Sequence, residues 1–169
     1  FGLMAMLSVF ISVSYSIADS GFGAVIVQRN DLTATDLTSV FWLNVSAGLI
    51  ISLCVNLISP LAAWFYGRNE LVALMQVLSI AVFFNAFQGV HNSLLNKELQ
   101  FKTLAKTGVI SQLLSGLLAI YLATNGYGAM ALAWCIVLDR LASTTLLWFI
   151  RHWRPQGGFS LSSAKKLYG

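Results

Sequence analysis

The sequence predicts an all-α integral membrane protein with about five membrane-spanning helices. Of its 169 residues, 57% are hydrophobic and only 9% are charged, whereas an average soluble domain carries about 25% charged residues. The apolar residues form runs of about 18 or more, the length that crosses a hydrocarbon core of roughly 30 Å. Spans this long must satisfy their backbone hydrogen bonds internally, and the alternation typical of membrane-spanning strands is absent from the sequence.

The apolar runs and the polar breaks between them define the expected elements. The first run has neither the preceding basic region nor the following cleavage site of a signal peptide, so we interpret it as a span. The glycines of Asp19–Gly23 predict a bend after it, and a basic stretch, Asn96–Lys106, separates the third and fourth spans. The expected spans are Phe1–Ala18, Ser39–Tyr66, Leu71–Leu95, Leu104–Thr124 and Tyr127–Ile150, with a polar tail from Arg151.

The distribution of basic residues predicts the orientation of the spans, because short cytoplasmic loops are enriched in Lys and Arg. One side of the expected bundle has Arg68 alone. The other side has Arg29, Lys97, Lys102, Lys106, Arg151, Arg154, Lys165 and Lys166. The second side is therefore expected to be cytoplasmic.

Aromatic residues lie near the expected ends of the spans, where amphipathic rings favour the headgroup level. We expect them to form interfacial belts, although each could also pack within the bundle. They are Trp42, Trp64, Phe65, Tyr66, Tyr121, Tyr127, Trp148 and Trp153.

Asp139 and Arg140 fall near the middle of the fifth expected span. A charged side chain there costs about 2.5–3.5 kcal/mol on insertion scales, so each needs compensation. Adjacent residues point about 100° apart on a helix and cannot form a well-aligned pair with each other. Three interpretations stay open: a structural ion pair with another helix, a role in a substrate or ion pathway, or a shifted end of the span.

The third expected span has a polar stripe formed by Asn85, Gln88 and Asn92, which lie within about 60° of one another on a helical wheel. His91 lies off this stripe and is expected to be a hydrogen-bonded core or interface residue. The second and fourth spans have small, weakly polar residues at intervals of four, which indicate either close helix packing or the wall of a hydrated cavity. These residues are Asn44, Gly48, Ser52 and Asn56, and Thr107, Ser111 and Ser115.

No pattern of catalytic or metal-ligating residues occurs in the sequence. Cys54 and Cys135 lie in apolar runs without a second ligand at a suitable spacing, so we expect buried thiols rather than a disulfide or a zinc site. The pair Gly21 and Gly23 lacks the third glycine and the lysine of a phosphate-binding loop. We therefore expect neither a catalytic site, nor a metal, nor a cofactor.

Four stretches keep a common order and spacing with the expected spans: Asp19–Arg29, Leu37–Asn44, Leu95–Lys102 and Phe159–Ser163. They resemble the bacterial polysaccharide flippases of the Wzx and colanic-acid or teichuronic-acid exporter type. These flippases belong to the multidrug/oligosaccharidyl-lipid/polysaccharide exporter superfamily. The resemblance covers essentially the whole chain and rests on no single diagnostic motif.

The resemblance implies a bacterial inner-membrane protein with about twelve helices in two bundles, of which this chain would be a fragment. Residues 1–150 would form helices two to six of the N-terminal bundle, and residues 151–169 the cytoplasmic linker toward the second. Such proteins are thought to move a glycan on polyprenyl diphosphate across the membrane by alternating opening of a central cavity. The implied partners are this lipid-linked oligosaccharide, membrane lipids and the polysaccharide-assembly machinery, with no nucleic acid.

A flippase gives the polar residues of the spans specific roles. Arg140 would bind the diphosphate, because a guanidinium binds phosphate oxygens in pairs. Asn85, Gln88 and Asn92 would bind sugar hydroxyls, and Asp139 would bind a coupling cation or proton.

Three alternatives stay open at the level of the sequence. A drug or cation antiporter of the same superfamily would line its cavity with acids, so the intramembrane Arg140 counts against it. A membrane-embedded glycan polymerase or ligase would need a larger external loop or clustered acid and base groups. A structural or assembly subunit is the third alternative.

Overall fold

The computed structural model describes residues 12, 22–29 and 31–156, and the described part of the chain contains helices and no strand. Four of these helices are long and apolar enough to cross a membrane, judged by length and composition. They confirm an all-α membrane protein. The first expected span, Phe1–Ala18, lies outside the described residues except for Ser12. The helices are α2 (Phe22–Gln28), α3 (Ala34–Tyr66), α4 (Glu70–Lys97), α5 (Phe101–Thr124) and α6 (Ala129–Ile150).

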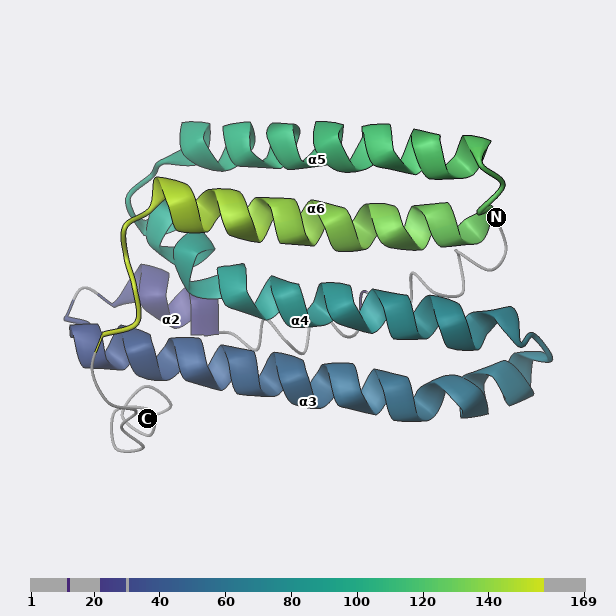
Figure 1. The fold of residues 1–169 in the computed structure, drawn as a ribbon. Helices are drawn as coiled ribbons and strands as arrows, with labels where there is room; N and C mark the ends of the chain where they lie inside the picture. Colours follow the sequence, from purple (N-terminus) through teal and green to yellow (C-terminus); the bar gives the residue numbers. More distant parts are fainter. Residues whose placement is uncertain (1–11, 13–21, 30, 157–169) are drawn as a thin grey trace.

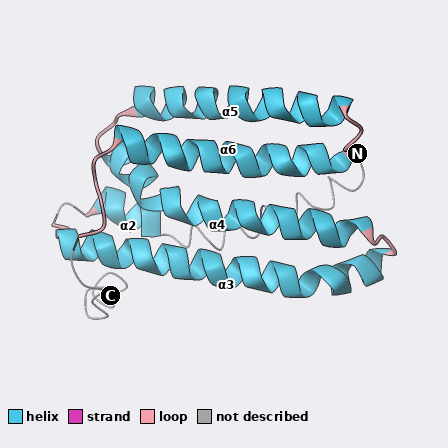
Figure 2. Ribbon diagram, viewed as in Figure 1, coloured by secondary structure: helices cyan, strands magenta, loops and turns pink. Residues whose placement is uncertain are grey.

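The long helices lie side by side in the order α5, α6, α4, α3, and the short α2 lies against one end of α4 (Figures 1 and 2). In α4, half of the most apolar stretch is buried, compared with 28% in α3 and 22% in α5 and in α6. Helix α4 is therefore the central helix of the described bundle. The outer faces of the other three are apolar and open, as expected of surfaces that contact lipid.

Helix α3 begins at Ala34, five residues before the expected start at Ser39. The reason is a capping box: the Thr33 hydroxyl accepts from the Asp36 backbone N–H at 3.3 Å, and the Asp36 carboxylate accepts from the Thr33 backbone N–H at 3.0 Å. The box satisfies two donors that helix ends leave unpaired. The last helical residue is Tyr66. Gly67 caps this end of the helix, and its φ of 64° is the left-handed conformation favoured for glycine at helix ends.

Pro60 lies inside α3 without ending the helix. A proline has no N–H, so the carbonyl oxygen of Asn56, four residues earlier, loses its usual donor. The Ser59 hydroxyl donates to this oxygen at 2.7 Å instead. The bond matters because lipid offers an unpaired carbonyl no replacement.

Small residues bring α3 and α4 together. A Cβ built on Gly48 would lie 2.4 Å from the Cβ of Ala86, so the two backbones approach as closely as glycine allows. One turn along, Ser52 Oγ donates to the Ser79 carbonyl at 2.9 Å, and Asn56 Nδ2 donates to the Ser79 hydroxyl at 2.5 Å. The small-residue stripe of this span therefore packs against its neighbour in its middle part.

The corresponding stripe of α5 has the same function. Thr107, Ser111 and Ser115 are its buried residues, whereas Val109 and Leu113 are exposed. The small side chains thus face the bundle, which favours packing over a hydrated wall for this helix.

Several expectations about local structure were wrong. Phe22 and Gly23 lie in α2 rather than in a bend, because Ile26 of this helix is buried to 1% exposure in a cluster with residues of α3 and α4. The connection between α4 and α5 is only residues 98–100, with Leu99 at a φ of 55°. Cys54 is exposed and Cys135 half-buried rather than buried, because Cys54 lies on a face of α3 that packs against no other described helix.

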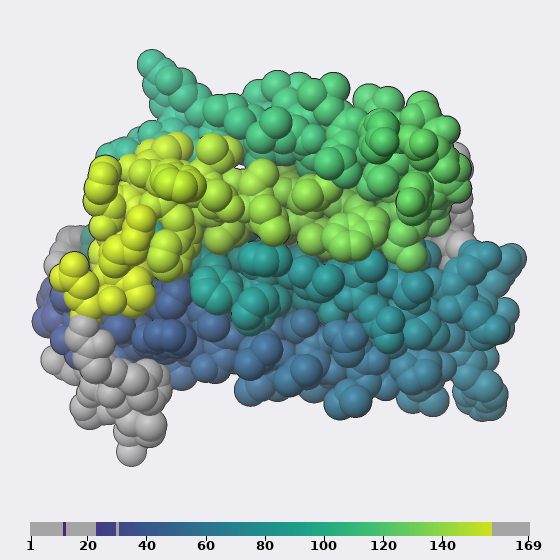
Figure 3. Space-filling model, viewed as in Figure 1, coloured from purple at the N-terminus to yellow at the C-terminus, as the bar shows by residue number. Residues whose placement is uncertain are grey.

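The segment 151–156 after α6 folds back across the ends of α4 and α3 (Figure 3). Arg151 donates to both carboxylate oxygens of Glu98, at 2.8 and 2.5 Å. Trp153 packs against Phe41, and the Thr38 hydroxyl exchanges hydrogen bonds with backbone atoms of Gln156 at 2.9 and 3.1 Å. Trp148 and Trp153 are therefore half-buried rings that pack against the core cluster around Phe41.

The Arg151 guanidinium holds the pKa of the Glu98 carboxyl below its ordinary value, through its hydrogen bonds first and its charge second. Because this pKa is lowered on folding, the pair stabilises the fold above the ordinary pKa of about 4.3 and loses that effect as the pH falls further. The pair is partly exposed, so its contribution is expected to be about 0–1 kcal/mol.

We expect Glu98→Gln to lower the melting temperature slightly at pH 7, and the difference from wild type to shrink progressively as the pH falls below the ordinary pKa of about 4.3 and through the lowered pKa of Glu98. Thermal unfolding of the protein in detergent across this pH range measures both. A difference that grows as the pH falls would contradict the assignment.

Candidate functional site

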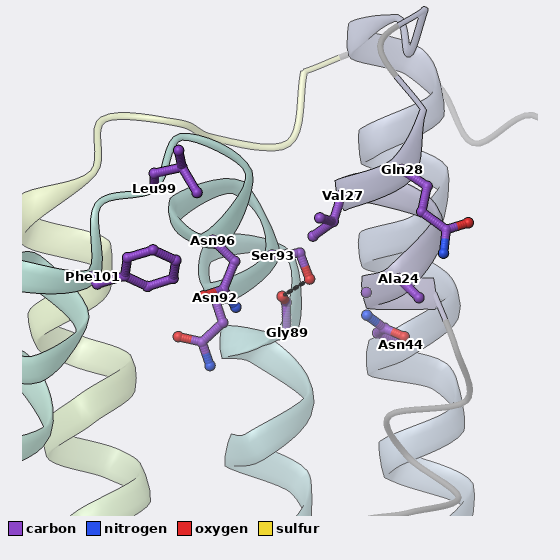
Figure 4. Close-up of a pocket in the computed structure, with 11 residues that line it drawn as sticks. Ala24, Val27, Gln28, Asn44, Gly89, Asn92, Ser93, Asn96, Leu99 and Phe101 are labelled. Atoms are coloured by element: carbon purple, nitrogen blue, oxygen red, sulfur yellow. Dashed lines mark hydrogen bonds between the residues drawn. The ribbon is translucent and has the colours of Figure 1, made fainter.

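A pocket of about 800 Å³, lined by both polar and apolar residues, lies between α2, α3 and α4 at the end of the bundle that carries Arg29, Lys97 and Arg151, here called the basic end. Its volume is typical of ligand sites, which occupy about 300–1,000 Å³. Figure 4 shows α2 and α3 on one side of the pocket and the end of α4 with Leu99 and Phe101 on the other. The lining residues are Gly23, Ala24, Val27, Gln28, Asn44, Gly89, Asn92, Ser93, Asn96, Leu99 and Phe101.

Asn44 of α3 lines the buried part of the pocket. This side chain is 6% exposed, and its Oδ1 has no hydrogen-bond partner within the described residues. A Cβ on Gly89 would lie 3.0 Å from Asn44 Nδ2, so the glycine makes room for the amide. A buried amide oxygen without a partner is rare and suits a site where a ligand or water supplies the donor.

The predicted stripe of α4 begins in the bundle and leads into this pocket. Asn85 and Gln88 are buried and bond to each other, from Gln88 Nε2 to Asn85 Oδ1 at 2.8 Å. The other oxygen of this pair, Gln88 Oε1, has no partner among the described residues. Asn92 is half-buried and lines the pocket, and Asn96, which follows at the same helical spacing, is exposed at its mouth.

Lys97 connects the ends of two helices that line the pocket. Lys97 Nζ donates to the backbone oxygen of Arg29, which ties the end of α4 to the end of α2. Lys97 is half-buried while Asn96 beside it is exposed. Lys97 does not itself line the pocket, but its positive charge, next to Asn96 in the chain, would attract an anionic group to this end of the bundle.

Asp139 faces α5 rather than α4. Its Oδ1 accepts from the Ser111 hydroxyl at 3.1 Å, and its Oδ2 lies 3.8 Å from Arg140 Nε. The longer distance confirms that the adjacent residues form only a loose pair. A hydroxyl of the α5 stripe therefore provides part of the compensation that a carboxylate in a span requires.

Arg140 lies on a different face of α6 from Asp139. It shares this face with Thr144, one turn further on, and the Thr144 hydroxyl donates to the Phe84 carbonyl of α4 at 3.1 Å. The Arg140 face is thus turned toward α4 at the level where the polar stripe begins. The Arg140 side chain is 33% exposed, so it is not sealed between helices.

His91 is a core residue, as expected. It is completely buried, with ring centroids 5.1 Å from Trp148 and 5.4 Å from Trp153. It therefore packs as an aromatic ring beneath segment 151–156, outside the pocket.

Comparison with known proteins places the chain in a family. The family model for "Polysaccharide biosynthesis protein" matches residues 1–169. The chain belongs to this family. Within the described residues no three His, Cys, Asp or Glu side chains come together as a metal site.

Three curated relatives carry names connected with polysaccharides. The teichuronic acid biosynthesis protein TuaB of Bacillus subtilis (strain 168) is 32% identical over 155 residues, which cover 90% of this chain and 32% of the relative. The lipopolysaccharide biosynthesis protein WzxC of Escherichia coli (strain K12) is 30% identical over 168 residues, which cover 96% of this chain and 34% of the relative. The succinoglycan biosynthesis transport protein ExoT of Rhizobium meliloti (strain 1021) is 25% identical over 162 residues, which cover 95% of this chain and 33% of the relative.

The chain therefore spans about a third of the length of the relatives it matches. No solved structure matches it significantly. Together with the apolar helices, the relatives identify this polysaccharide biosynthesis protein as a multi-pass bacterial membrane protein.

Sequence analysis missed several residues of the pocket. Asn96 continues the stripe at a spacing of four, but it fell outside the expected span, which ended at Leu95. Asn44 was placed on a stripe of small residues for which close packing and a cavity wall both stayed open, and nothing in the sequence signals that it meets Gly89 of another helix. Gln28 lines the pocket from α2, which was not expected to be a helix, and Ser93 lines it from α4.

Proposed function

We propose that this polysaccharide biosynthesis protein exports oligosaccharide linked to polyprenyl diphosphate across the bacterial inner membrane. The observation that carries the proposal is the row of amides that runs from Asn85 in the bundle to Asn96 at the mouth of the pocket. Amide side chains offer donors and acceptors without charge, which suits the many hydroxyls of a glycan. Polar side chains within membrane spans are costly and usually functional, so a row of them in an apolar bundle indicates a binding role.

The two charges of α6 would serve the anionic part of the substrate and the driving ion. Arg140, turned toward the level where the row begins, would bind the diphosphate through paired hydrogen bonds. Asp139, held by Ser111, would bind a coupling cation or proton. None of these roles involves a covalent step, so the proposed activity is transport and not catalysis.

The proposal is tested by replacing one amide of the row. Gln88→Leu is expected to reduce surface polysaccharide at least severalfold in cells that depend on this protein, because the buried row would lose a donor and an acceptor that the glycan needs. Gln76→Leu is the matched control, since Gln76 lies on the same helix but is exposed. Surface polysaccharide and protein abundance are measured in the same cells.

Equal losses of polysaccharide in the two variants, or normal polysaccharide in a stably inserted Gln88→Leu protein, would contradict the role of the row. A change in drug resistance without a change in polysaccharide would favour the antiporter instead.

Water access to the row can be measured with single cysteines. Asn92→Cys is expected to react with a small water-soluble thiol reagent at least several times faster than Val82→Cys, because Asn92 lines the pocket whereas Val82 is 2% exposed. Asn85→Cys should react more slowly than Asn92→Cys, since Asn85 lies deeper. Inertness at Asn92 equal to that at Val82 would mean that helix packing seals the pocket.

A further inference from the structure

A second groove of about 440 Å³ lies between α4 and α6 near the basic end of the bundle. Phenylalanines of α4 form one wall, and the last turns of α6 form the other. The two threonines in this wall offer no free hydroxyl, because Thr144 donates to the Phe84 carbonyl and Thr145 to the Leu141 carbonyl. The lining residues are Phe83, Phe84, Phe87, Thr144, Thr145, Trp148, Phe149 and Arg154.

One end of this groove carries a fixed cation. The Arg154 guanidinium lies 4.9 Å above the Trp148 ring. It donates to the backbone oxygens of Arg151, Trp153 and Trp148 at 3.0, 2.9 and 2.8 Å. These carbonyls orient the guanidinium without neutralising its charge, and a guanidinium has five donors in all. Arg154 is exposed, so it can still bind an outside anion.

The groove is open to the outside of the bundle, since Phe149 is 77% exposed and Thr145 is also exposed. Phe83 and Phe87 lie on the opposite side of α4 from Asn85, by the 100° step of a helix. A glycan that follows the amide row would therefore not pass this groove.

We propose that the groove binds an acyl chain of an anionic phospholipid, with the lipid phosphate at Arg154. The mainly apolar walls favour an acyl chain over a polar occupant, because both threonine hydroxyls already donate to backbone carbonyls and offer no donor to replace bonds to water. Arg154 follows the end of α6, at the headgroup level expected of the cytoplasmic leaflet, where anionic lipids attract basic side chains. Arg151 is paired with Glu98, so Arg154 supplies the charge that recognises the headgroup.

The occupant is a lipid of the bilayer and not the transported substrate, because the groove and the amide row lie on different faces of α4. The inference is independent of the proposed function, since a protein with any activity in this membrane could hold such a lipid. A bound lipid would fill the space between α4 and α6 and add contacts between the two helices.

Native mass spectrometry of the detergent-purified protein, with phosphatidylglycerol or phosphatidylcholine of equal chain length added, tests this inference. The wild type is expected to retain about fivefold more phosphatidylglycerol than phosphatidylcholine. This ratio corresponds to the roughly 1 kcal/mol that one basic residue contributes near an anionic headgroup. Arg154→Gln should abolish the preference and Arg154→Lys should keep most of it. Lys102→Gln, at an exposed cation of the same end, should leave it unchanged.

A second variant tests the groove separately from the charge. Thr145→Trp places a bulky ring at an exposed position of the wall and is expected to reduce retention of both lipids. Equal retention of both lipids by the wild type, or unchanged retention by Thr145→Trp, would overturn the inference. Retention of added polyprenyl phosphate but not of phosphatidylglycerol would also overturn it, because the groove would then belong to the substrate.

Discussion

Gly48→Leu is expected to abolish most of the folded protein in the membrane. Even a single Cβ at this position would lie 2.4 Å from the Cβ of Ala86, so a leucine cannot enter the contact between α3 and α4 without separating the helices. Overpacking of a close contact costs about 1–3 kcal/mol and sometimes more. The separation would also break the bonds from Ser52 and Asn56 to Ser79, which lipid cannot replace.

Abundance in the membrane and melting temperature in detergent measure this effect. Gly108→Leu is the matched control, because a Cβ on Gly108 of α5 meets nothing within 4 Å, and it should leave both values near wild type. The milder Gly48→Ala should be rescued in part by Ala86→Gly, which removes the atom that it would strike. Wild-type stability of Gly48→Leu would show that the two helices are not in close contact.

Arg140→Ala is expected to abolish polysaccharide export while the protein still inserts at normal abundance. The guanidinium lies inside a span where its charge is costly, and we propose that it binds the diphosphate of the substrate. Arg140→Lys should retain some export, because it keeps the charge but loses the paired hydrogen bonds. Surface polysaccharide and protein level, measured in the same cells, separate transport from folding.

A purely structural Arg140 would give a different result. Its removal would leave a partner carboxylate uncompensated, so abundance would fall, and removing that acid as well should restore it. Asp139 at 3.8 Å is one candidate for this acid. Normal export by a stably inserted Arg140→Ala protein would exclude a role in substrate binding.

The long helices could be predicted from the sequence because each depends on a single property, the length of an apolar run. The predicted start of α3 was five residues too late, because the capping box of Thr33 and Asp36 extends the helix beyond its apolar part. Helix α2 was missed because its seven residues cannot form a stable helix alone and depend on the packing of Ile26.

The site was predictable to the extent that it lies on one helix. Helical periodicity alone grouped Asn85, Gln88 and Asn92, and the structure keeps them on one face. The pocket also needs Asn44 from α3 and the space above Gly89, which is a tertiary contact between residues 45 positions apart. The packing of Trp148 against Phe41 and His91 could not be predicted from sequence, because a ring near a span end fits the lipid interface and the bundle interior equally well.

Translocation in a defined membrane tests the central claim most directly. The protein, purified and reconstituted into liposomes, is supplied with polyprenyl-diphosphate oligosaccharide in one leaflet, and the fraction reaching the other leaflet is followed with an enzyme that cannot cross the membrane. We expect protein-dependent translocation that Gln88→Leu reduces severalfold and Gln76→Leu leaves unchanged. Translocation no faster than in empty liposomes, or equally fast in both variants, would contradict the proposal that the amide row carries the glycan.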